Sequence, residues 1–134
     1  MGFRVVEHTA DVAVELWAPD EAALLVEGLR AIVSLMTEGA ALAPDASRQV
    51  SIDALDPEDR LVQWLNEIIY LALVEGFLAS DAVVGLREGG LDATLAGVQD
   101  AAHLIRGELK SVTYHELELR RFPDRVETTI VIDV

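Results

Sequence analysis

The stretch from Asp56 to Gly76 carries the clearest structural signal in the sequence. Asp56 can cap the start of a helix, Pro57 suits its first position, and Gly76 suits its end. Apolar residues recur between them every three or four positions, as on the buried face of an amphipathic helix: Leu61, Trp64, Leu65, Ile68, Leu71 and Ala72, widened by Ile69 and Leu73. The stretch therefore predicts a long helix at the centre of the fold.

A second helical pattern begins at Asp20, which can cap it, with Glu21 favourable in its first turn. Gly28 weakens the pattern, because a glycine inside a helix costs about 1 kcal/mol relative to alanine. The apolar positions still define one face: Ala22, Leu25, Val26, Leu29, Ile32, Val33 and Met36. The sequence predicts a second helix, buried on this face.

The remaining regular segments read as strands. Glu88-Gly89-Gly90 and Phe122-Pro123-Asp124 are turn signals that predict two hairpins. The expected strands cover residues 3–7, 12–17, 48–54, 81–87, 91–98, 110–121 and 125–134. Two helices and about seven strands, mostly in hairpins, predict one α+β domain over residues 1–134 with antiparallel-rich β-sheet.

Charge is the strongest feature of the composition, with 24 acidic residues against 10 basic ones and a formal net charge of −14. Such a surface disfavours direct tight binding of nucleic acid and suits a basic protein, a divalent cation or solvation alone. The chain has no cysteine, which excludes disulfides and thiolate metal sites. No apolar run approaches the ~20 residues of a membrane span, and no signal peptide is visible. We expect a cytoplasmic protein without membrane contact.

Several polar side chains lack an obvious folding purpose. Each also has an ordinary structural interpretation, as a turn cap, the solvated face of a strand, the polar side of a helix or plain surface. These residues are His8, Thr9 and Asp11 between the first two strands, Asn66 and Glu67 in the long helix, Lys110, Thr113, Tyr114 and His115 in the second half, and Asp133 near the end.

Three of the carboxylates could form a metal site. Asp11, Asp133 and the terminal carboxylate of Val134 are hard oxygen ligands, which Ca²⁺, Mg²⁺ or Mn²⁺ prefers. The site requires that the first and last strands lie side by side. His8 or His115 could join a softer metal, but no HExxH spacing supports zinc.

Sequence templates for an autonomous catalyst are missing. The chain contains no GxSxG elbow, no Cys–His pair and no GxxxxGK[ST] loop. No pair of carboxylates stands out by its spacing as a hydrolytic couple. The residues by themselves therefore do not indicate an enzyme.

The chain resembles the archease family along essentially its whole length. The resemblance lies in "EHTADVAVELWA", "LMTEG", "LVQWLNEIIYLALVEGFL", "LKSVTYHELELR" and "VIDV", in this order. It implies a non-enzymatic activator of the GTP-dependent RNA ligase that joins 3′-phosphate or 2′,3′-cyclic phosphate ends to 5′-hydroxyl ends in tRNA splicing and RNA repair. Such an activator promotes guanylylation of the ligase's active-site histidine and allows multiple turnover.

Carried over by position, the resemblance implies a divalent metal site at Asp11, Asp133 and Val134, with Ca²⁺, Mg²⁺ or Mn²⁺ as the ion. It also implies an acidic tip that enters the ligase's basic, nucleotide- and metal-binding cleft. Two other functions stay open, a small metal-dependent hydrolase and a general chaperone-like acidic interaction protein. The residues expected to serve the partner are His8, Thr9, Glu67, Lys110 and His115, whereas His103 falls in a stretch that departs from the family pattern.

Overall fold

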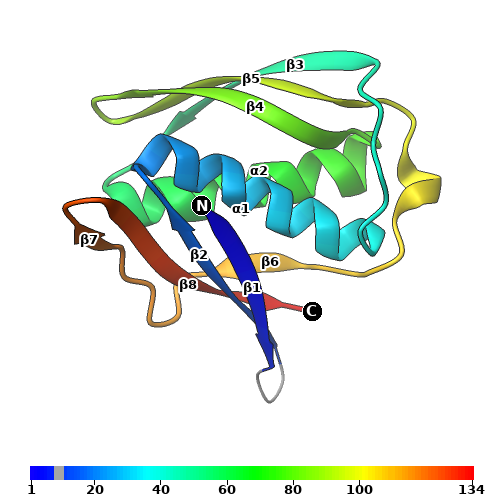
Figure 1. Cartoon of the computed structure of the whole chain (residues 1–134). Helices are drawn as coiled ribbons and strands as arrows, with labels where there is room; N and C mark the ends of the chain where they lie inside the picture. The colour runs from blue at the N-terminus through cyan, green and yellow to red at the C-terminus, as the bar shows by residue number, and fades with distance from the viewer. Residues whose placement is uncertain (8–10) are drawn as a thin grey trace.

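The computed structural model describes residues 1–7 and 11–134, and over these residues the chain forms two α-helices, eight strands and a short 3₁₀ helix (Figure 1). Neither helix of this described part is long and apolar enough to cross a membrane. The predicted α+β class is confirmed. The elements are β1 (Gly2–Glu7), β2 (Val12–Ala18), α1 (Glu21–Thr37), β3 (Ala46–Asp53), α2 (Pro57–Glu75), β4 (Leu78–Arg87), β5 (Gly90–Val98), η1 (Ala102–Leu104), β6 (Ser111–Thr113), β7 (Arg120–Phe122) and β8 (Arg125–Asp133).

Within the described residues the strands form two antiparallel sheets. The larger sheet has the order β1-β2-β8-β6, and β7 also pairs with β8. The smaller sheet has the order β3-β5-β4. Figure 1 shows both helices between the two sheets, so the fold has three layers with the apolar core on either side of the helices.

Helix α1 begins where the sequence predicts, because the side chain of Asp20 accepts a hydrogen bond of 2.8 Å from the N–H of Ala23. Most of the predicted face is buried, but Ala22 and Val26 are only half-buried. Burial extends instead to residues such as Leu24 and Ala31, since both sheets cover the helix. A Cβ at Gly28 would lie 2.9 Å from Cδ2 of Leu65, so the glycine permits close approach of the two helices. Of the two helices, α1 is the more fully buried, and α2, which the sequence predicts at the centre of the fold, lies beside it in the same layer.

Helix α2 has the predicted limits. Asp56 accepts a hydrogen bond of 2.8 Å from the N–H of Asp59, and Gly76 ends the helix with a left-handed φ of 67°. The predicted apolar face is buried, except that Leu73 remains 47% exposed. The apolar pattern overestimated the width of the buried face, because the outward side of α2 is not covered by either sheet.

The two predicted hairpins are present, but the predicted strand over residues 110–121 is wrong. Within this segment and the turn after it, only Ser111–Thr113 and Arg120–Phe122 pair with β8. Between them, the Tyr114 hydroxyl and the Leu119 N–H donate hydrogen bonds to carboxylates in the first turn of α2. The segment therefore follows the start of the helix and leaves the sheet.

Candidate functional site

Asp11 and Asp133 lie on neighbouring segments at one end of the larger sheet. Strand β2 begins directly after Asp11, and its Val12 pairs with Ile132 of β8, which directly precedes Asp133. The next positions outward in this antiparallel register are Asp11 and Asp133. The required adjacency is therefore met by β2, the second strand, whereas the first strand β1 lies at the edge of the sheet.

The start of β6 flanks the same end of β8. Ser111 pairs with Asp133, and the backbone N–H of Lys110 donates a hydrogen bond of 2.8 Å to the carbonyl oxygen of Asp133. Asp11 is half-buried, whereas Asp133 and Val134 are exposed. We call Asp11, Asp133 and Val134 the acidic tip; Lys110 lies beside it.

The backbone of Lys110 lies next to the acidic tip, and its side chain forms no ion pair with another described side chain. Eight arginines form ion pairs with Asp or Glu side chains, counted over the part of the chain that the structure describes. Within the same part, Lys110 and Arg106 form none, although Arg106 donates a hydrogen bond to the carbonyl of His103. Lys110 is exposed, so its ammonium can pair with an external anion.

Asn66 fixes the position of β6 beside the tip. Its side-chain oxygen accepts a hydrogen bond of 2.7 Å from the N–H of Val112, and its amide donates one of 3.2 Å to the Val112 carbonyl. Because β6 is the edge strand of the larger sheet, these two bonds satisfy backbone groups that a further strand would otherwise pair with. The polar interruption of α2 at Asn66 has a structural role, and Glu67, the next residue, is half-buried.

The tip's donor chemistry suits a hard divalent cation. Asp11 and Asp133 supply carboxylate oxygens, and neither forms an ion pair with another described residue. Among the side chains that the structure describes, no group of three or more His, Cys, Asp or Glu is placed to hold a metal ion. An ion at this end of the sheet would therefore need ligands beyond the two aspartates.

Of the other predicted residues, His115 lies away from the tip. His115 follows β6 at the end remote from Asp133, and its side chain is 59% exposed, with Nε2 lying 3.9 Å from Glu116. His8 and Thr9 lie outside the described residues. Of the residues predicted to serve a partner, the structure brings Lys110 to the tip and leaves His115 apart from it.

Sequence reasoning missed the contact between Tyr114 and Asp59. The Tyr114 hydroxyl donates to the Asp59 carboxylate, which lowers the pKa of Asp59, and the Leu55 N–H lowers it further. The same hydrogen bond raises the pKa of Tyr114, with burial as a smaller cause. The available signal was the pair of acids that follows Pro57, which can bond to a neighbouring segment as well as to the helix terminus.

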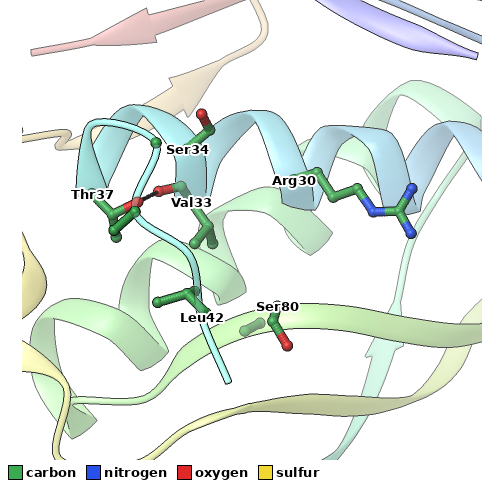
Figure 2. A pocket seen from close by; sticks show the side chains of 9 residues that line it. Arg30, Val33, Ser34, Thr37, Leu42 and Ser80 are labelled. Carbon is green, nitrogen blue, oxygen red and sulfur yellow. Dashed lines mark hydrogen bonds between the residues drawn. The ribbon is translucent and has the colours of Figure 1, made fainter. Parts of the chain in front are cut away.

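A groove of about 240 Å³ lies away from the tip, between the second half of α1, the loop that follows it, and β4 (Figure 2). Figure 2 shows that the Thr37 hydroxyl bonds to the Val33 carbonyl of its own helix, at 2.8 Å. Arg30, at the rim, pairs with Glu27 and Asp81. These polar groups are engaged within the protein, so the acidic tip remains the candidate site.

The archease protein family model matches residues 3–134. Protein archease of Methanopyrus kandleri is 30% identical over 140 residues, and that of Archaeoglobus fulgidus is 28% identical over 137 residues. In both cases the match covers 100% of this chain and 100% of the relative.

Solved structures share the fold. The solution structure of a Methanobacterium thermoautotrophicum protein has a TM-score of 0.80 with 25% identity, and the match covers 99% of each chain. The crystal structure of an archease from Thermotoga maritima, described as a possible chaperone, has a TM-score of 0.70 with 24% identity. That match covers 96% of this chain and 94% of the other.

Proposed function

Because the chain belongs to the archease family, we propose that it is the protein activator of the GTP-dependent RNA ligase that joins 3′-phosphate ends to 5′-hydroxyl ends. In this role it promotes guanylylation of the ligase's active-site histidine and allows each ligase molecule to complete many turnovers. It serves tRNA splicing and RNA repair through the ligase and is not itself a catalyst.

The observation that carries the proposal is the register between β2 and β8, which brings Asp11 and Asp133 to one end of the sheet. In this proposal Asp11, Asp133 and Val134 hold a divalent cation, Ca²⁺ or Mg²⁺/Mn²⁺. A bound cation would supply positive charge that can orient phosphate oxygens. Lys110, whose backbone bonds to Asp133, contributes a second positive charge beside them.

The charge of the chain favours encounter with a basic cleft. A net charge of −14 steers the protein toward a surface built to accept phosphates and metal ions. Binding there shifts the ligase toward its active form only if the activator has different affinities for the two forms. His8, Thr9, Glu67 and His115 are the further residues that we assign to contact with the ligase.

The test is a multiple-turnover ligation assay with the organism's own 3′-phosphate ligase, GTP and divalent cation, and a catalytic amount of this protein. Asp11→Asn and Asp133→Asn remove tip charges. Asp124→Asn is the matched control, because Asp124 is an exposed aspartate in the β7–β8 turn, at the opposite end of β8. We expect stimulation by the native chain and by Asp124→Asn, and at least a tenfold smaller effect from the two tip variants.

Other outcomes separate the alternatives. Equal stimulation by all variants would retain the ligase as partner but contradict the role of the tip, as expected for a chaperone-like protein. Absence of stimulation by the native chain, with a ligase that stalls after one turnover alone, would contradict the activator role. Metal-dependent hydrolysis by the purified chain, lost in Asp11→Asn, would instead identify a small hydrolase.

A further inference from the structure

The outward side of α2 carries an apolar surface that the rest of the described chain leaves open. Tyr70 is 44% exposed, Leu73 47% and Val74 68%. They follow Glu67 at the three- and four-residue spacing that places side chains on one side of a helix. We call Glu67, Tyr70, Leu73 and Val74 the α2 stripe.

The α2 stripe begins beside the strand that borders the acidic tip. Asn66, one helical turn before Tyr70, forms its two hydrogen bonds with Val112 of β6. The neighbouring residue of β6, Ser111, pairs with Asp133 of the tip. β6 therefore contacts both the helix that carries the stripe and the strand that ends in the tip.

Charge limits what can cover the stripe. After Arg60, α2 has no basic residue, and its charged side chains there are Glu67 and Glu75. Glu75 already pairs with Arg48 at 2.7 Å, so Glu67 is the acid of this stretch without a described ion pair. A second copy of this chain would bring another net charge of −14 to the interface, which opposes self-association. The complementary partner presents apolar side chains bordered by Lys or Arg, as the rim of a basic cleft would.

We infer that the α2 stripe is a second docking surface for the RNA ligase, contacted by apolar side chains on the rim of the ligase's basic cleft. The inference rests on the proposed function for the identity of the partner. It also assigns different roles to the stripe and the tip. The apolar contacts of the stripe hold the ligase, whereas the tip acts on its active site.

The experiment measures both binding and turnover. The double variant Leu73→Gln/Val74→Gln replaces two exposed residues with good helix formers, so that the helix is retained. The matched control is Val83→Gln/Leu86→Gln, which changes two apolar residues of β4 that are 78% and 42% exposed. Strand β4 belongs to the smaller sheet, across the helices from the larger sheet that carries the tip (Figure 1). Each protein is titrated against the full-length ligase for its Kd, and stimulation is then measured at saturation.

We expect the stripe variant to raise the Kd about tenfold while its stimulation at saturation stays near that of the native chain. The β4 control should bind as the native chain does. Equal Kd values for stripe variant and native chain would overturn the inference and leave the proposed function intact. Native binding without stimulation would overturn the proposed function, and the same Kd comparison would still decide the stripe. No native binding would overturn both.

Discussion

Glu21, at the start of α1, accepts a hydrogen bond of 2.6 Å from Nε of Arg60 in the first turn of α2. The carboxylate is only 8% exposed, and it also accepts a hydrogen bond of 3.0 Å from Arg121 of β7. Arg60 in turn donates to the Gly90 carbonyl, at 3.1 Å. One carboxylate thus connects both helix starts, the smaller sheet and the β7–β8 hairpin.

Glu21→Gln should destabilise the protein by about 2–3 kcal/mol, because it leaves the Arg60 guanidinium largely buried without its counter-charge. Arg121→Gln should cost less than about 1 kcal/mol, since a 53% exposed arginine is readily solvated. Urea denaturation of the two variants measures both values. Because Glu21→Gln removes both pairs, equal losses would show that the Glu21–Arg60 pair adds nothing to the exposed one.

Asn66→Ala should lower the free energy of unfolding by about 2–3 kcal/mol, because both backbone groups of Val112 lose their partner at a residue that is 3% exposed. Gln63→Ala, one turn earlier on the exposed side of α2, should change it by less than about 0.5 kcal/mol. Hydrogen exchange of the Val112 amide gives an independent measurement. Unchanged protection in Asn66→Ala would contradict the bracing role.

Acid should weaken the contact between Asp59 and Tyr114. The pKa of Asp59 in the folded protein lies below its ordinary value of 3.8, chiefly because of the Tyr114 hydroxyl. The resulting stabilisation is present above pH 3.8 and is lost as the pH falls through the folded-state pKa. In Tyr114→Phe we expect the Asp59 pKa, followed by NMR of its carboxyl group, to rise toward 3.8.

Alkali should act on the same contact from the other partner. The pKa of Tyr114 is raised above its ordinary value of 10.0 by Asp59, so its stabilisation is complete below pH 10.0 and is lost as the pH rises through the folded-state pKa. Ultraviolet titration in a Tyr70→Phe background follows Tyr114 alone, because the chain has 2 tyrosines. Adding Asp59→Asn should bring the Tyr114 pKa down toward 10.0. A titration unchanged by Asp59→Asn would show that the hydrogen bond does not persist in solution.

A divalent cation should stabilise the native chain if it binds the acidic tip. At about 100 times the Kd, a ligand specific for the folded state adds about 2.7 kcal/mol to the free energy of unfolding. We therefore expect Ca²⁺ or Mn²⁺ to raise the melting temperature of the native chain and of Asp124→Asn. Asp11→Asn and Asp133→Asn should lose this increase, and an increase retained in all variants would place the ion elsewhere.

The sequence predicts elements whose signals are local. Asp20, Asp56 and Gly76 mark helix ends because capping involves hydrogen bonds to residues nearby in the chain. The alternation of apolar and polar residues over 110–121 predicts one strand, and this prediction is wrong. Carboxylates of α2 accept hydrogen bonds from the middle of the segment, which therefore does not pair with β8 there. The predicted burial of Leu73 is wrong, because an apolar pattern does not reveal where a covering element ends.

The candidate site illustrates the same limit. Asp11 and Asp133 could be singled out as hard oxygen ligands, but their adjacency depends on the order of strands in the sheet, which no local pattern encodes. The bonds of Asn66 to β6 were likewise unpredictable, since both its partners are backbone groups of Val112. What the sequence offered was a polar residue on an apolar helix.

The acidic tip and its support combine Asp11, Asn66, Ser111 and Asp133, which are spread over almost the entire chain. Contacts of such long sequence separation form only after the intervening segments have closed into loops, so they are expected late in folding. A partly folded chain could have both helices and the β4–β5 hairpin and still lack the tip. Activity that depends on the tip would therefore report completion of the whole fold.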